Sequence, residues 1–160
     1  LSVVDLGCGD FNVGKRLIAF TEYYVAVDIV PELIERNKKV FIDERLEFRC
    51  LDLATGELPF GDVALLRNVL QHLSNGEIQA IVPKLAQYKY VLLTEHIPDG
   101  DFIPNVNIIS GQGIRLKKQS GVDLMAPPFN FQVKDTHQIL TVPFKENKGK
   151  VVSRLYRGIL

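Results

Sequence analysis

The chain has 160 residues, of which 46% are hydrophobic and 24% charged, which suits a single domain with an apolar core. Its 19 basic and 19 acidic residues cancel, so we expect neither nucleic acid nor an anionic membrane as a partner. No apolar run approaches the roughly 18 residues of a membrane-spanning helix, and no stretch has the pattern of a signal peptide. Two cysteines, with neither a disulfide framework nor a CxxC pair, predict a reduced, cytoplasmic protein without a metal site.

Apolar strands and helices alternate in the first hundred residues. Pro31 marks the first turn of one helix, and Ser74 with Glu77 predicts a capping box that opens another. Strands separated by helices predict a parallel sheet with right-handed crossovers and helices on both faces. The expected strands are 2–6, 24–29, 46–51, 62–67 and 90–96, and the expected helices are 14–20, 31–41 and 74–87.

The pattern changes after His96. Residues 98–134 combine Pro, Gly, Asn and charges without a sustained period, and a connection of this length is usually functional or disordered. We expect it to form an insertion or lid on the substrate side. Its basic cluster at 115–118 is either a solvated face or a lid that meets an acidic acceptor, and Phe129 and Phe131 either serve that lid or pin the loop to the core.

The last part of the chain predicts an antiparallel hairpin. Strands at 136–144 and 150–160 flank the turn KENKGK, which has the Asn and Gly typical of a turn. With no internal repeats, residues 1–160 are predicted to form one domain. Because Leu1 already lies inside an apparent strand, we expect an N-terminal segment that is missing here.

The run VVDLGCGD at 3–10 is the most informative motif. It is an apolar strand that runs into a tight turn, where Gly7 and Gly9 can adopt positive φ and let a ligand approach the backbone. Strand, glycine loop and helix in this order are typical of nucleotide binding at the carboxyl end of a parallel sheet.

Carboxylates follow three successive strands and therefore lie at one edge of the predicted sheet. Asp28 comes 19 residues after Gly9, where an acid can bind the two hydroxyls of a ribose. Asp52 ends the third strand, where its side chain can meet an adenine amino group. Each also has a simpler interpretation as a cap or turn residue, but together with Asp5 they favour a ligand site.

A dinucleotide site is disfavoured because G-x-G-x-x-G would need glycine at Asn12. Asp5 and Asp10 flank the turn, and negative charge suits a cationic ligand better than a phosphate. A sulfonium that also carries an α-ammonium group is such a ligand.

These residues, with LDL at 51–53 and NVLQHL at 68–73, resemble the class I S-adenosylmethionine-dependent methyltransferases over nearly the whole chain. The resemblance implies a Rossmann-like three-layer αβα sandwich with a mostly parallel seven-stranded sheet of order 3-2-1-4-5-7-6. It also implies S-adenosylmethionine as cofactor. The implied contacts are Asp5, Gly7, Cys8 and Gly9 near the methionine part, Asp28 and Ile29 near the ribose, Asp52 and Leu53 around the adenine, and Asn68 and Val69 beneath the transferred methyl.

One position departs from the family pattern D-x-G-x-G-x-G. Phe11 stands where the last glycine is expected. Either Phe11 turns away and Gly14 takes over the close approach, or the affinity for the cofactor is reduced.

Three side chains near the carboxyl edge are candidate catalysts. His72 follows the fourth strand, and Glu95 and His96 end the fifth. A general base is needed only when the acceptor must lose a proton, since in-line transfer from a sulfonium depends largely on positioning.

We expect a methyltransferase that acts on a small molecule, because Asn68-Val69-Leu70-Gln71 lacks the D/N-P-P-Y/F pattern of enzymes that modify nucleic acids or proteins. Two alternatives stay open. One is a degenerate methyltransferase fold that serves as a non-catalytic binding module. The other is a Rossmann NAD(P)-dependent oxidoreductase.

Overall fold

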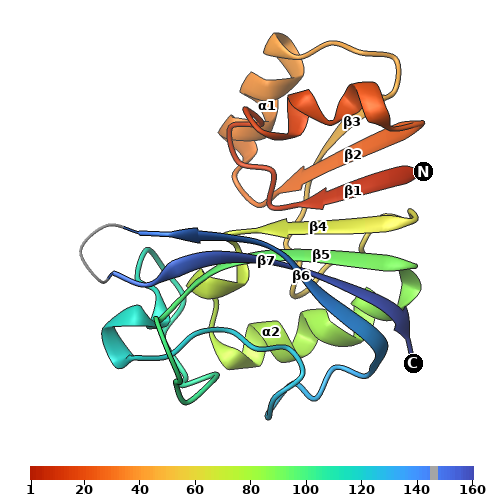
Figure 1. Ribbon diagram of the computed structural model, residues 1–160. Helices are drawn as coiled ribbons and strands as arrows, with labels where there is room; N and C mark the ends of the chain where they lie inside the picture. Colours follow the sequence, from red (N-terminus) through yellow and green to blue (C-terminus); the bar gives the residue numbers. More distant parts are fainter. Residues whose placement is uncertain (145–147) are drawn as a thin grey trace.

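The computed structural model describes residues 1–144 and 148–160, which form a seven-stranded sheet with helices on both faces (Figure 1). The order across the sheet is β3-β2-β1-β4-β5-β7-β6, and β7 runs antiparallel to both of its neighbours. This arrangement confirms the predicted Rossmann-like fold and differs from the order 3-2-1-4-5-6 of dinucleotide-binding domains. The strands are β1 (Ser2–Leu6), β2 (Tyr23–Asp28), β3 (Leu46–Cys50), β4 (Val63–Arg67), β5 (Tyr90–Ile97), β6 (Val133–Pro143) and β7 (Lys150–Ile159).

Alternate side chains of β1, β2 and β4 enter two separate cores. Val4 of β1 belongs to the larger core, which the helix α2 (Asn75–Ile81) covers. Val3 belongs to the smaller core on the other face, which the helix α1 (Pro31–Val40) covers. The helices therefore make the outer layers of the sandwich, and the carboxyl ends of β1, β2 and β4 meet at one edge (Figure 1).

The first predicted helix, at 14–20, is wrong. The residues form two 3-10 turns, η1 (Gly14–Arg16) and η2 (Ile18–Phe20). So short a segment completes few i→i+4 hydrogen bonds, and glycine is a weak helix former. The backbone instead makes i→i+3 bonds, such as the one from the Leu17 N–H to the Gly14 carbonyl at 2.8 Å.

The helix predicted at 74–87 begins where expected but ends early. Ser74 and Glu77 form the predicted capping box. The α-helix stops at Ile81 because Pro83 has no N–H to continue the ladder and its ring crowds the preceding turn. A 3-10 turn, η4 (Val82–Gln87), takes its place.

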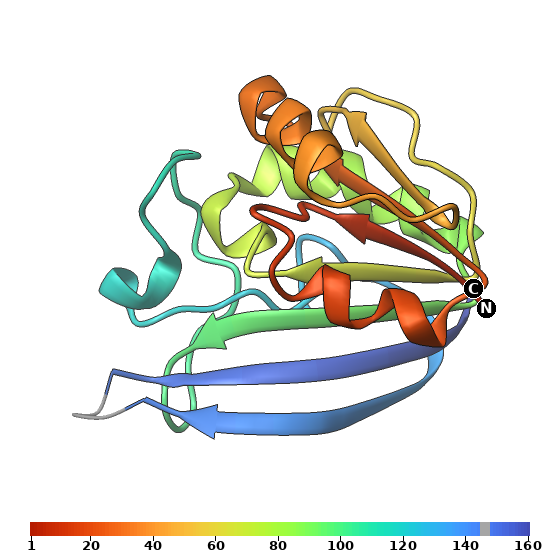
Figure 2. The ribbon, with the colours of Figure 1, turned by 90° about the horizontal axis from the view of Figure 1, so that it is seen from above.

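Residues 98–132 contain one regular element within the described chain, the 3-10 turn η5 (Arg115–Lys118). The segment projects past the carboxyl ends of the strands and then returns along the sheet (Figure 2). Phe129 and Phe131 are buried in the same core as α2, so these rings pin the segment to the sheet. Arg115 is 1% exposed, so the cluster at 115–118 is not simply a solvated face.

The predicted hairpin is confirmed, with β6 starting three residues earlier than the expected 136. Residues 145–147 of its turn lie outside the described residues. No helix in the described part of the chain is long and apolar enough to cross a membrane.

Candidate functional site

The glycine turn after β1 is built by backbone geometry. Gly7 and Gly9 have φ angles of 93° and 56°. A Cβ atom on Gly7 would lie 2.3 Å from Cγ2 of Val69, whereas one on Gly9 would meet no heavy atom within 4 Å. Glycine is therefore required at position 7 by both packing and conformation, and the bare backbone of Gly9 faces open space.

Asp28 at the end of β2 holds this turn in place. Its Oδ2 accepts a hydrogen bond from the Gly9 N–H at 2.9 Å, and its Oδ1 accepts one from the Val30 N–H at 3.0 Å. Asp28 therefore organises the glycine turn and caps the approach to α1, which fits its interpretation as a cap or turn residue.

A cavity of about 410 Å³ opens at the carboxyl ends of β1, β2, β3 and β4. It brings together most of the residues predicted to contact a cofactor. The predicted cofactor contacts that line the cavity are Gly7, Gly9, Asp28, Ile29, Asp52, Leu53, Asn68 and Val69. Of the candidate catalysts, His72 lines it.

Two buried polar atoms at this cavity have no hydrogen-bond partner within the described residues. They are Oδ1 of Asn68 and Nδ1 of His72. Asn68 also has a positive φ of 56°, which an L-residue adopts at a cost. Both atoms are shielded from the open cavity, although their residues line it.

Other lining residues were not singled out from the sequence. Arg67, which ends β4, lines the cavity together with Asp52 and Glu77. Leu51 and Ala54 add apolar wall beside Leu53. Arg67 was recognisable by the rule that singled out Asp28, since it is a charged residue at a strand's carboxyl end. Glu77 was not recognisable in this way. Whether it lines the cavity depends on how α2 packs, which its capping motif does not reveal.

Asp5 and Cys8 do not line this cavity. The Asp5 side chain faces the smaller core, where its Oδ2 accepts a hydrogen bond from the Tyr24 hydroxyl at 2.9 Å. Burial raises the pKa of Asp5 to about 6 against the lowering effects of Tyr24 and Arg67. Cys8 is buried in the same core, and burial raises the pKa of its thiol well above the ordinary value.

Glu95 also lies outside this cavity and holds the turn that forms its wall. Its two carboxylate oxygens accept hydrogen bonds from the N–H groups of Leu70 (3.1 Å) and Gln71 (3.0 Å), at the start of the turn η3 (Leu70–His72). Burial raises the pKa of Glu95 to about 8, although these bonds and Arg115 act in the opposite direction.

Arg115 secures the other end of the same turn. Its guanidinium donates to the carbonyls of Leu70 (3.3 Å), Gln71 (3.4 Å) and Leu73 (2.8 Å) and to Oδ1 of Asn75 (2.7 Å). A buried carboxylate at one end and a buried guanidinium at the other therefore fix the loop that carries His72.

His96 lies away from the cavity, near the start of β7. Its ring stacks on Phe144 with centroids 4.4 Å apart, and its Nε2 lies 2.7 Å from the Lys148 carbonyl. Its backbone N–H donates to Oε1 of Gln71 at 2.8 Å. The structure thus places His72 at the cavity and separates Glu95 and His96 from it.

Phe11 turns away from the cavity. It is fully buried with a φ of 62°, and its ring makes edge-on contacts with Tyr24, Phe41 and Phe48 at centroid distances of 4.9–5.5 Å. Gly14 makes its close approach to this ring and not to the cavity, since a Cβ there would lie 2.3 Å from Phe11.

Residues 4–87, more than half of the chain, match the family model of the methyltransferase domain. The chain belongs to this methyltransferase family. The match covers the glycine turn, Asp28 and the η3 loop, so the predicted family is confirmed. No curated protein matches the chain in sequence.

Solved structures share the fold of this domain, including two that are named as methyltransferases. Human N-acetylserotonin methyltransferase in complex with S-adenosylmethionine is 19% identical with a TM-score of 0.65, and the match covers 99% of this chain and 48% of that one. N-methyltransferase NodS from Bradyrhizobium japonicum, solved with S-adenosyl-L-homocysteine, is 9% identical with a TM-score of 0.67 and coverages of 98% and 77%. TehB from Haemophilus influenzae is 15% identical with a TM-score of 0.63 and coverages of 98% and 57%. This methyltransferase domain therefore spans about half the length of the human enzyme.

Proposed function

We propose that this chain binds S-adenosylmethionine in the 410 Å³ cavity and transfers its methyl group to a small-molecule acceptor. The observation that carries the proposal is the convergence of the glycine turn, Asp28 and the Asn68–His72 loop on one cavity at the carboxyl ends of four strands. Ligands of open α/β sheets bind at this edge.

The lining fits the parts of this cofactor. Asp28 would accept hydrogen bonds from the ribose hydroxyls while it keeps the Gly9 N–H in place. Leu51, Leu53 and Ala54 offer an apolar surface for the adenine ring, and Asp52 lies beside them.

The charges of the lining also fit. Asp28, Asp52 and Glu77 line the cavity and suit a ligand with a sulfonium and an ammonium group. Phe11 leaves the cavity free, so the departure from the glycine pattern does not obstruct this binding mode.

The bound cofactor supplies a methyl group that a sulfonium makes ready for displacement. The chain's contribution is to position the reactants and, where the acceptor must lose a proton, to receive it at the ring of His72. His72 can take that role because it lines the cavity and the Glu95 and Arg115 contacts keep η3 in place.

In this proposal the methyl acceptor binds at the rim of the cavity, beside His72. There the Gly111 N–H donates to the His72 carbonyl at 3.0 Å, and the Ser110 hydroxyl donates to the Glu77 carboxylate. These contacts of Ser110 and Gly111 support residues 98–134 as the substrate-side insertion. The human relative is named for a small acceptor, N-acetylserotonin, which supports a small-molecule substrate.

The test incubates the folded chain with S-adenosylmethionine and a panel of small oxygen, nitrogen and sulfur nucleophiles, and measures S-adenosylhomocysteine and methylated product by mass spectrometry. We expect at least one acceptor to be methylated, and the Asp28→Ala variant to lose that activity. Cofactor binding without turnover on any acceptor would favour the non-catalytic module instead.

A further inference from the structure

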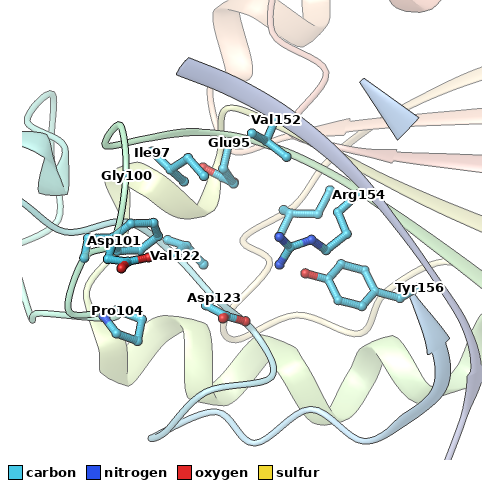
Figure 3. A pocket seen from close by; sticks show the side chains of 12 residues that line it. Glu95, Ile97, Gly100, Asp101, Pro104, Val122, Asp123, Val152, Arg154 and Tyr156 are labelled. Atoms are coloured by element: carbon cyan, nitrogen blue, oxygen red, sulfur yellow. The ribbon is translucent and has the colours of Figure 1, made fainter. Parts of the chain in front are cut away.

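A second cavity of about 410 Å³ lies on the α2 side of the sheet, between β5, β7 and the segment 98–132 (Figure 3). It shares no lining residue with the first cavity. The turn η3 separates the two, because Glu95 lines the second cavity while its carboxylate binds backbone N–H groups of η3. An occupant of the second cavity would therefore lie apart from a methyl group held in the first.

Charges of both signs enter this second cavity. Arg154 projects into it from β7, and Asp123 faces it from the opposite side (Figure 3). Asp101 adds another carboxylate from the connecting segment. Within residues 1–144 and 148–160, none of these three side chains forms an ion pair. The Arg154 guanidinium and the carboxylates of Asp123 and Asp101 thus face one cavity without forming ion pairs with one another.

The remaining lining makes the hollow suitable for a small organic molecule. Tyr156 is 1% exposed and places its hydroxyl beside the Arg154 guanidinium (Figure 3). Apolar wall comes from Leu93, Val122 and Val152. Apolar walls with a few convergent polar groups are the usual composition of small-molecule sites.

We propose that this second cavity is a binding site for a small zwitterion of the amino-acid type, with its carboxylate on Arg154 and its ammonium group on Asp123 and Asp101. A guanidinium binds a carboxylate through paired N–H donors, and a carboxylate binds an ammonium through charge-assisted hydrogen bonds. A ligand with only one charge would leave the group of the other sign without a partner. The site stands independently of the cofactor assignment.

The test measures binding to the folded chain by calorimetry and by two-dimensional NMR. The probes are 4-aminobutyrate and shorter amino acids, with butyrate and butylamine as matched ligands of the same length that carry one charge each. We expect a zwitterion to bind, and its NMR shifts to cluster on β5, β7 and residues 100–104 and 122–123. We expect butyrate and butylamine to bind at least about tenfold more weakly, because each lacks one charge-assisted contact.

Two variants locate the ligand's two ends. Arg154→Gln and Asp123→Asn should each weaken zwitterion binding at least about tenfold. Arg157→Gln, on the same strand but outside this cavity, should leave it unchanged. Circular dichroism checks that each variant is folded. If one variant unfolds, the binding measured for the other variant provides the test. The proposal is overturned if no amino acid binds at millimolar concentration, if the singly charged probes bind equally well, or if both folded variants bind like the wild type.

Discussion

Phe11 and Gly14 are packed so closely that a Cβ atom on Gly14 would lie 2.3 Å from Cε2 of the Phe11 ring. The ring occupies the smaller core and not the cavity at the strand ends. The residue that departs from the family's glycine pattern has therefore become a core residue, and its effect falls on stability.

Phe11→Ala should lower the free energy of unfolding by about 3–5 kcal/mol, the usual cost of removing a fully buried ring. The affinity of the folded protein for S-adenosylhomocysteine should change by less than about threefold, a factor worth well under 1 kcal/mol. Urea denaturation and calorimetry measure the two quantities. Phe60→Ala is the control, since Phe60 is 86% exposed and its removal should cost within about 0.5 kcal/mol. A large loss of affinity without a loss of stability would contradict the placement of Phe11.

Gly14→Ala should destabilise the protein by about 1–3 kcal/mol, because the new methyl group overpacks the core against Phe11. Gly76→Ala serves as its control. A Cβ at that position in α2 meets no atom closer than 3.9 Å, so alanine there should stabilise the helix by about 0.4–1 kcal/mol. Urea denaturation should show changes of opposite sign in the free energy of unfolding of the two variants. Equal changes would contradict the prediction.

The strand order came from the resemblance to the methyltransferase family, whereas the strands followed from the sequence because apolar runs and strand-end residues are local signals. The same holds for α2, where the Ser74–Glu77 capping box marks the start of the helix. The helix predicted at 14–20 was wrong because its apolar spacing is helical while its hydrogen bonds are of the 3-10 type. Local periodicity does not distinguish these two in so short a segment.

Residues that follow strands could be predicted to lie near the site, but the direction in which each side chain points could not. Asp28 and Asp5 both lie near the same edge, yet Asp28 lines the cavity whereas Asp5 is buried against Tyr24. The role of Arg115 depends on how residues 98–132 fold back onto η3, which no periodic pattern encodes. The second cavity arises from that same irregular segment.

His72 and His96 should differ sharply in catalysis. For an acceptor that loses a proton, His72→Gln should lower kcat by roughly 10²-fold or more, the usual contribution of a positioned base. His96→Gln should change kcat by no more than a few-fold, because its ring stacks on Phe144 away from the cavity. Steady-state kinetics with an acceptor from the panel compares them. The reverse order of effects would contradict the assignment of His72.

Glu95 should make stability fall as pH rises. Its pKa in the folded protein is raised to about 8, whereas an unfolded glutamate titrates near about 4.3. Between these values the native state binds more protons than the unfolded state, so the free energy of unfolding decreases with pH. This stabilisation is complete below about pH 4.3 and is lost as the pH rises to about 8.

Urea denaturation at several pH values between 5 and 8 measures this effect as the difference between the wild type and Glu95→Gln. The free energy of unfolding of the wild type should fall relative to that of Glu95→Gln as the pH rises. Asp5 titrates in both proteins, so its contribution cancels. Parallel stability curves would show that Glu95 is ionised throughout.

The most direct test of the central claim is the binding of S-adenosylhomocysteine to the folded chain, measured by calorimetry for the wild type, Asp28→Ala and Asp10→Ala. Asp10 is the matched control because it is exposed, lies outside the cavity and bonds to Asn12. The wild type and Asp10→Ala should bind alike, and Asp28→Ala should bind roughly 10- to 100-fold more weakly through the loss of charge-assisted hydrogen bonds. No binding heat with folded wild-type protein, or equal affinity in all three proteins, would contradict the account.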